Sequence, residues 1–262
     1  MYLQQEKKSR NMFHNFLLYS QSLKEMSQSK KLINTLNAHS YNLARKDEEF
    51  REALKNSDVL LPDGIGIVLA TRVLTERKLS KIAGEDLFYH EMKRLNSQGG
   101  KCFFLGSTEK TLKLICKRAK TEFPQLQAFY YSPPFKTHFS EEDNNAMINA
   151  INEIEPDVLF VGMTAPKQEK WAYKHYQLLN ANHICCIGAV FDFYAGTIKR
   201  APKWMINAGL EWLYRLLSEP KRLWRRYLIG NTLFIVQIIK EKFSSGKNKT
   251  ETFKSVVNSK QN

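Results

Sequence analysis

The feature that most constrains the fold is an alternation of short apolar runs with helical patterns, which begins near Ser40. Each run has the length of a buried strand, and several are stopped by glycine or proline. Val59 to Leu61 ends at Pro62-Asp63-Gly64, and Cys102 to Leu105 ends at Gly106. Strands that alternate with helices in this way are typical of parallel βαβ units. The sequence therefore predicts an α/β fold with a Rossmann-like parallel sheet.

Apolar periodicity predicts helices between these strands. Helices are expected to begin at Ile65 and to run from Glu85 to Asn96. Another apolar pattern at helical spacing covers Tyr41 to Lys55 and predicts one amphipathic helix. Its expected inward-facing residues are Leu43, Phe50 and Leu54.

The same strand, turn and helix unit recurs later in the chain. Residues 157–162 read as a strand, a loop runs from Met163 to Pro166, and a helix opens near Lys167. A weaker version spans Ile184 to Val190. Ligands of parallel sheets bind at the carboxyl ends of the strands, so three turns are candidate walls of a site. They are Pro62 to Gly64, Gly106 to Thr108 with Ser107 as the expected helix N-cap, and Gly162 to Gln168.

The segment from Thr197 differs from the rest of the chain in charge and composition. It holds 14 Lys and Arg against 4 Asp and Glu, so it carries +10 of the formal net charge of +14. Tryptophans alternate with arginines there, and the apolar stretch Leu228 to Ile239 follows. This mixture predicts a C-terminal basic helical appendage that associates with a membrane interface. An ordinary amphipathic helix packed on its own core is the alternative.

Two further patterns bear on cellular location and on metals. No run reaches the roughly 18 apolar residues that span a bilayer, and the N-terminus lacks the apolar core of a signal peptide. We therefore expect a cytoplasmic protein. The four cysteines and the histidines show no ligand spacing suited to zinc, so we expect buried free thiols and no metal site.

Five motifs occur in order along the chain. They are Leu61-Pro62-Asp63-Gly64-Ile65-Gly66, Gly84-Glu85-Asp86-Leu87-Phe88, Ala165-Pro166-Lys167-Gln168-Glu169-Lys170-Trp171, Phe191-Asp192-Phe193 with Ala195-Gly196, and Lys199-Arg200-Ala201-Pro202-Lys203-Trp204. Residues Gly209 to Leu217 extend the pattern. From about Ile33 to about Asn231, the chain resembles the WecG/TagA/CpsF family of bacterial glycosyltransferases.

The resemblance implies an inverting hexosyltransferase that takes a UDP-sugar, with N-acetylmannosamine or its uronic acid as the sugar in family members. The implied acceptor is a saccharide carried on undecaprenyl diphosphate, in the synthesis of a cell-surface polysaccharide. No cofactor is implied. The expected partners are the UDP-sugar donor, the lipid-linked acceptor and an anionic membrane surface, with no nucleic acid. The appendage would associate peripherally with the inner face of the plasma membrane, and homo-oligomerisation is left open.

Against the family pattern, the chain divides into four parts. Residues 1–32 form a segment that diverges from the family's opening strand and helix, and residues 33–196 form the α/β catalytic core. Residues 197–240 form the expected appendage, and residues 241–262, rich in Lys, Ser and Asn, are expected to form a disordered tail. Tyr131 to Phe135 stands where many members have a Gly-Tyr pair. That departure leaves the identity of the sugar open.

Asp63 is the expected catalytic base, because an inverting transfer needs one carboxylate to deprotonate the acceptor hydroxyl. Pro-Asp-Gly is also a common turn, and the matching position in the family favours the base. Thr35 and Asn37 match a polar pair that the family places near the substrates. We expect Thr35 to act in catalysis and Asn37 to bind substrate, with helix capping as the alternative.

Two turns are expected to bind the donor nucleotide. Gly106 and Ser107 let backbone amides approach an anion at a helix start, although such turns commonly carry glycine or serine for backbone reasons. Lys167 at a helix start opposes the macrodipole, so it is either solvated or held there for an anion. Gln168 could contact the uracil edge or a sugar hydroxyl.

The chain contains no Asp-x-Asp pair, which many transferases use to hold a metal at the departing diphosphate. Protein cations are expected instead, and the resemblance identifies three arginines of the appendage: Arg215, Arg222 and Arg225. A basic face attracted to anionic lipid is the alternative for each. Asp192 could be a second acidic group of the site or a structural partner of Arg200, and we expect the structural role.

Two other classes of function are weighed against the transferase. A basic nucleic-acid-binding α/β protein fits the pI near 9.5, but the chain lacks a helix-turn-helix, RNP or zinc pattern. A dinucleotide-dependent oxidoreductase fits the predicted sheet, but no Gly-x-Gly-x-x-Gly follows a candidate strand.

Overall fold

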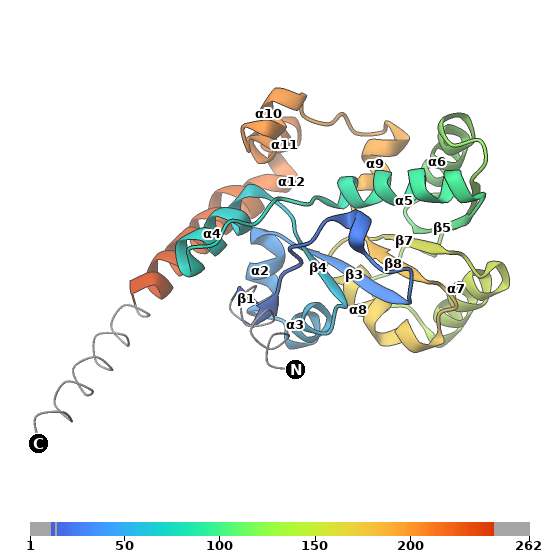
Figure 1. Cartoon of the computed structure of the whole chain (residues 1–262), viewed down its shortest axis with the longest axis horizontal. Coiled ribbons are helices and arrows are strands. Elements are labelled where there is room, and N and C mark those ends of the chain that lie inside the picture. The colour runs from blue at the N-terminus through green and yellow to red at the C-terminus, as the bar shows by residue number, and fades with distance from the viewer. Residues whose placement is uncertain (1–11, 14, 244–262) are drawn as a thin grey trace, which may run out of the picture.

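A computed structural model describes residues 12, 13 and 15–243. Its centre is a six-stranded parallel sheet with the strand order β4-β3-β8-β7-β5-β6, so the predicted α/β fold is confirmed (Figure 1). A short antiparallel hairpin of β1 (Met12–Phe13) and β2 (Phe16–Leu17) precedes the sheet. The sheet consists of β3 (Lys31–Leu36), β4 (Val59–Pro62), β5 (Lys101–Gly106), β6 (Gln127–Tyr131), β7 (Val158–Gly162) and β8 (His183–Cys186).

Helices cover both faces of this sheet (Figure 1). The core helices are α2 (Ala38–Ala44), α3 (Glu48–Lys55), α4 (Ile65–Thr75), α5 (Gly84–Gln98), α6 (Glu109–Glu122), α7 (Glu141–Ile154), α8 (Lys167–His175) and α9 (Val190–Ala195). Short 3-10 turns occur at Leu23–Glu25 and Tyr176–Leu178. The appendage comprises α10 (Lys203–Asn207), α11 (Glu211–Ser218), α12 (Pro220–Trp224), the π-helical η3 (Arg225–Ile229) and a helix over residues 230–243.

Burial on both faces explains why the strands are almost continuous apolar runs. In β5, Cys102 and Phe104 pack into the cluster under α5, α6 and α9, whereas Phe103 and Leu105 pack into the cluster under α7 and α8. Phe104 also stacks on Phe160 of β7 with ring centroids 5.4 Å apart. Because both faces are filled with apolar side chains, polar chemistry is confined to the ends of the strands.

Most predicted elements have the predicted positions. A helix begins at Ile65, α5 covers Glu85 to Asn96, and α8 opens at Lys167. The weaker unit after Ile184 is also present, as β8 followed by α9. Residues 241–243 of the predicted disordered tail are helical. The rest of that tail lies outside the described residues, as do residues 1–11 and 14.

Two local predictions are wrong. Tyr41 to Lys55 is two helices, because the Asp47 side chain accepts a hydrogen bond from the Phe50 backbone nitrogen at 3.0 Å and starts α3. Phe50 and Leu54 are buried as expected, while Leu43 is only half-buried. Ser107 is not the N-cap of α6. That role belongs to Thr108, whose hydroxyl accepts from the Thr111 nitrogen at 3.2 Å.

The last helix of the appendage packs its inner face on the core. Phe234 contacts the Tyr41 ring edge-on at 5.4 Å, and Ile238 joins the same buried cluster. The Asn42 side chain donates a hydrogen bond to the Gly230 carbonyl at 2.7 Å. A Cβ atom built on Gly66 of α4 would lie 3.6 Å from the Phe234 ring, so α4 runs close against this helix (Figure 1). The core and the appendage therefore share one hydrophobic cluster.

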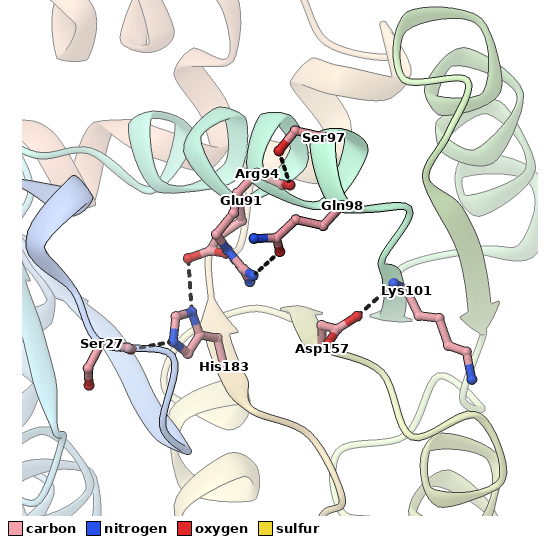
Figure 2. A network of polar contacts seen from close by, with 8 residues as sticks. All are labelled: Ser27, Glu91, Arg94, Ser97, Gln98, Lys101, Asp157 and His183. Atoms are coloured by element: carbon pink, nitrogen blue, oxygen red, sulfur yellow. Dashed lines mark hydrogen bonds and ion pairs between the residues drawn. The ribbon is translucent and has the colours of Figure 1, made fainter.

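A buried polar network joins elements at the amino-terminal ends of the strands (Figure 2). Glu91 of α5 is 0% exposed and hydrogen-bonds His183 of β8 at 2.9 Å, while Arg94 contacts the same carboxylate at 2.7 Å. The other ring nitrogen of His183 lies 3.0 Å from the Ser27 carbonyl. Burial alone would raise the pKa of Glu91, but His183 and Arg94 outweigh it and lower that pKa. The network links α5, β8 and the chain before β3.

We predict that Glu91→Gln destabilises the fold by about 3–5 kcal/mol at pH 7, because it leaves Arg94 facing a neutral partner in a buried site. Since the folded state lowers the Glu91 pKa, this contribution is present at neutral pH and is lost as the pH falls through that lowered pKa. Urea unfolding at pH 7 and at a series of pH values below 4.5, the ordinary pKa of a glutamate, measures both effects. Glu52→Gln, which removes an exposed pair with Lys55, is the matched control, and an equal loss in the two variants would contradict the prediction.

Candidate active site

Asn37 and Asp63 directly follow the neighbouring strands β3 and β4, so both lie at the carboxyl-terminal edge of the sheet, where the strands end. β3 and β4 pair in parallel with Leu36 opposite Pro62, so the next residues lie side by side. The Asp63 backbone nitrogen donates to the Leu36 carbonyl at 2.9 Å, which continues the pairing. Alternate residues of a strand share a face, so Thr35, opposite Leu61, lies on the same face as Asn37 and Asp63. The sheet register thus brings the three expected residues together.

The Asn37 side chain has both its oxygen and its nitrogen engaged. Its oxygen accepts hydrogen bonds from the His39 nitrogen at 3.1 Å and from the Ser40 nitrogen at 3.0 Å, which caps α2. Its amide nitrogen is therefore the group that faces Asp63, and it hydrogen-bonds that carboxylate. Helix capping, the alternative for Asn37, is present, and substrate binding by this side chain stays a prediction.

Asp63 combines a raised pKa with several charged neighbours. Burial is the largest cause and, together with the nearby carboxylate of Glu211, raises the pKa of Asp63 to about 6. Lys81, the Asn37 hydrogen bond and Arg226 act in the opposite direction. A carboxylate with this pKa is ionised at neutral pH and holds a proton more strongly than an ordinary aspartate. Such a group suits a general base.

Sequence reasoning did not select three of these neighbours. Lys81 precedes α5, Glu211 begins α11, and Arg226 lies in η3. The Arg226 Nε is buried without a hydrogen-bond partner, and burial lowers the pKa of this guanidinium. The pattern of inward-facing Leu223 and Tyr227 could have identified Arg226, because it lies between them on the same turn of helix.

Two of the three expected arginines lie near Arg226. Arg215 and Arg222 both act electrostatically on the Arg226 guanidinium. The Arg215 Nε is also buried without a hydrogen-bond partner, and its guanidinium lies 5.5 Å from the centre of the Phe193 ring. Arg222 is exposed and pairs with Glu219 at 2.6 Å. Arg225 is exposed and stacks over the Trp224 ring at 5.3 Å.

The turn after β5 has tight backbone geometry. Gly106 has φ +115°, and a Cβ there would lie 2.5 Å from the Gly162 carbonyl oxygen at the end of β7. Glycine is therefore required by the close approach of two strand ends. Ser107 has φ +54°, and its carbonyl accepts from the Ser132 hydroxyl at 2.9 Å. This turn lies at the same edge of the sheet as Asp63.

The loop after β7 is held from within by Gln168. Its side-chain oxygen accepts from the Met163 nitrogen at 3.1 Å, and its amide nitrogen donates to Glu169 at 2.9 Å. Burial raises the pKa of Glu169 to about 7. The Lys167 ammonium donates to the Lys136 carbonyl and lies 3.5 Å from the centre of the Phe139 ring. Gln168 is thus mainly engaged in shaping this loop.

The expected pair of Asp192 and Arg200 does not form. Arg200 instead contacts Glu85 and Glu211, because it lies between the start of α5 and the start of α11. Asp192 accepts from the Thr197 hydroxyl, with Arg215 and Arg222 also acting on its carboxylate. Asp192 therefore lies beside the arginine cluster.

Within the described ranges, no three His, Cys, Asp or Glu side chains gather as a metal site would require. The four cysteines are free thiols, three of them buried. No helix among residues 12, 13 and 15–243 has the length and apolarity to cross a membrane.

The chain is similar to one protein family and to several individual proteins. The profile of the glycosyl transferase WecG/TagA/CpsF family matches residues 13–248, which extends the resemblance at both ends of the chain. N-acetylglucosaminyldiphosphoundecaprenol N-acetyl-beta-D-mannosaminyltransferase of Bacillus subtilis is 32% identical over 197 residues, 75% of each chain. The proteins of the same name from Bacillus spizizenii and Staphylococcus aureus strain MW2 are 30% and 26% identical. These matches cover 78% and 81% of this chain and 77% and 82% of those proteins.

Proposed function

Because this chain belongs to the WecG/TagA/CpsF glycosyltransferase family, we propose that it transfers N-acetylmannosamine from a UDP-linked donor to N-acetylglucosamine on undecaprenyl diphosphate. Membership of this family identifies the chain as a glycosyltransferase. The acceptor and the sugar follow the names of its relatives. The observation that carries the proposal is the Asp63 carboxylate, held by Asn37 at the sheet edge under the arginines of the appendage.

In the proposed reaction, Asp63 takes the proton from the acceptor hydroxyl. The freed oxygen attacks the anomeric carbon of the donor sugar from the side opposite the phosphate. The new carbon–oxygen bond forms as the bond to phosphate breaks, and UDP leaves with the electron pair. Inversion follows from this single displacement. Thr35, on the same sheet face, lies in a position to orient the acceptor or Asp63.

The arginines are proposed to neutralise the departing diphosphate. Arg215 and Arg226 each have a buried Nε with no hydrogen-bond partner, and such a donor suits a phosphate oxygen. Arg222 and Arg225 are exposed beside them and extend the positive charge outward. Gly106, Ser107, Lys167 and Gln168 are proposed to bind the nucleotide at the neighbouring strand ends. Lys81 adds a further cation next to Asp63.

The outer surface of the appendage is proposed to bind an anionic membrane at the inner face of the plasma membrane. Leu228, Ile235 and Ile239 are each at least half exposed, at helical spacing. On the adjacent α4, Leu69 and Val73 are similarly exposed. Exposed apolar side chains beside lysines and arginines suit the headgroup region of a bilayer. The acceptor's lipid would then enter next to the arginines. The nucleic-acid alternative has no support in the family or in the relatives.

We predict that Asp63→Asn lowers turnover by at least about 10²-fold, since it removes the base and keeps the side-chain size. UDP binding should remain close to wild type.

In the wild-type enzyme, kcat/KM should fall below about pH 6, where Asp63 becomes protonated. Burial raises the Asp63 pKa in the folded state, so ionised Asp63 destabilises the fold as the pH rises through that value. Asp63→Asn should therefore unfold no more readily than wild type at pH 8, and near-wild-type turnover would remove Asp63 from the mechanism.

A second prediction separates arginines from metal. Turnover on a soluble, short-chain acceptor should survive EDTA, whereas Arg215→Ala, Arg222→Ala, Arg225→Ala and Arg226→Ala should each lower it. We expect Arg226→Ala to lose about 10²-fold or more, because its guanidinium acts electrostatically on the Asp63 carboxylate. Arg51→Ala, which breaks a surface pair with Glu48, is the control. Loss of turnover in EDTA that Mg²⁺ restores would show the proposal of metal-independent transfer to be wrong.

A third prediction concerns the membrane surface. Ile235→Ser with Ile239→Ser, and separately Leu69→Ser with Val73→Ser, should weaken cosedimentation with vesicles containing anionic lipid. Turnover on the soluble acceptor should stay within about twofold of wild type. Leu178→Ser is the matched control, because Leu178 is 57% exposed, close to the 56% of Ile235, but lies after α8. Unchanged vesicle binding in both double variants would contradict the proposed surface.

A further inference from the structure

Arg200 lies at the junction between the core and the appendage. It precedes α10 and contacts two carboxylates from distant parts of the chain. Its Nη1 contacts Glu85 at the start of α5, and its Nε donates to Glu211 at the start of α11 at 3.3 Å. Its guanidinium also lies 5.9 Å from the centre of the Phe193 ring in α9. These contacts connect α5 and α9 of the core to α11 of the appendage.

All three charged side chains are largely shielded from water. The exposed fractions of the side chains are 22% for Arg200, 23% for Glu85 and 27% for Glu211. Ion pairs with this degree of burial are screened less than surface pairs, and their geometry is more constrained. The pattern is one cation between two carboxylates, so removal of Arg200 would leave two like charges facing each other.

Glu211 also lies close to Asp63, because a Cβ built on Gly209, two residues before Glu211, would lie 3.1 Å from the side chain of Ile65, two residues after Asp63. The charged groups that act on Asp63 are Glu211 from α11, Lys81 from the loop before α5 and Arg226 from η3. Among these, only Glu211 makes Asp63 hold its proton more strongly, so it raises the strength of Asp63 as a base. Two carboxylates placed close together repel one another. Glu211 therefore needs a cation to remain there, and Arg200 supplies it.

We propose that Arg200 is a positioning residue that clamps Glu211 beside Asp63 and so couples Asp63 to docking of the appendage. The inference rests on the proposed role of Asp63. It assigns the appendage a second contribution besides its arginines. When α11 is seated, Asp63 is a stronger base. When α11 is displaced, Glu211 leaves and Asp63 becomes a weaker base.

The test compares full-length wild type with Glu211→Gln, Arg200→Ala and Arg200→Lys. In Glu211→Gln and Arg200→Ala, the acidic limb of kcat/KM should move to lower pH, because Asp63 loses the carboxylate that raises its pKa. In Arg200→Ala, kcat at pH 7.5 should fall by up to about 10²-fold, as for other misplaced catalytic groups. Arg200→Lys should recover part of both effects, since it keeps the charge and loses the second contact.

Arg118→Ala is the matched control. Arg118 is an arginine of α6 that pairs with Glu122 and stacks over Tyr194 at 4.5 Å, and no described contact joins it to the appendage. Its removal should leave the pH profile in place. An unchanged acidic limb in Glu211→Gln, or an Arg200→Ala profile equal to that of Arg118→Ala, would overturn the proposal.

Hydrogen exchange provides a readout that needs no substrate. Arg200→Ala should increase exchange of the backbone amides of α10 and α11, and Arg118→Ala should not. If the wild-type protein transfers no sugar between the proposed substrates but exchange responds, the proposed function fails while the clamp stands. If the wild-type protein transfers sugar and neither exchange nor the acidic limb responds, the clamp fails alone.

Discussion

The parallel pairing of β3 with β4 is the constraint on which the rest of this molecule depends. Both faces of the sheet are filled with apolar side chains, so a reactive polar group can be exposed only where a strand ends. The register that places Leu36 opposite Pro62 also places Asn37 beside Asp63. One set of backbone hydrogen bonds therefore stabilises the sheet and aligns the amide that holds the base.

The environment of Asp63 balances opposing influences. Burial and Glu211 make the carboxylate reluctant to ionise, whereas Asn37, Lys81 and Arg226 favour its charged form. The result is a pKa near 6, which leaves Asp63 ionised and strongly basic at neutral pH. Two of these influences, Glu211 and Arg226, come from the appendage. The Asp63 carboxylate thus belongs to the core, but its chemical character is set by both parts of the chain.

The two edges of the sheet use buried charge differently. At the amino-terminal edge, Glu91 is satisfied by His183 and Arg94, and the network fastens α5 to β8. At the carboxyl edge, the buried Nε atoms of Arg215 and Arg226 have neither a hydrogen bond nor an ion pair among the described residues, whereas the buried Arg94 Nη2, which also lacks a hydrogen bond, pairs with Glu91 at 2.7 Å. A satisfied network adds rigidity, whereas unsatisfied donors reduce stability and are retained where a ligand can complete them. This contrast supports the carboxyl edge as the functional one.

The sequence by itself determined the parallel α/β architecture, because apolar periodicity and glycine or proline stops are local and repeat along the chain. The choice of Asp63 as the base came from the family resemblance, since Pro-Asp-Gly alone is also a common turn, and it stays a prediction. The sequence also identified the appendage from its charge. It did not show that Asp47 divides residues 41–55 into two helices. One long helix and two short helices bury the same apolar residues, so the apolar pattern does not distinguish them. Nor could the sequence show that Arg226 lies next to Asp63, or that Arg200 pairs with Glu85 and Glu211 rather than Asp192. These choices depend on how the appendage packs on α2 and α4, and contacts between residues far apart in sequence leave no local periodicity to read.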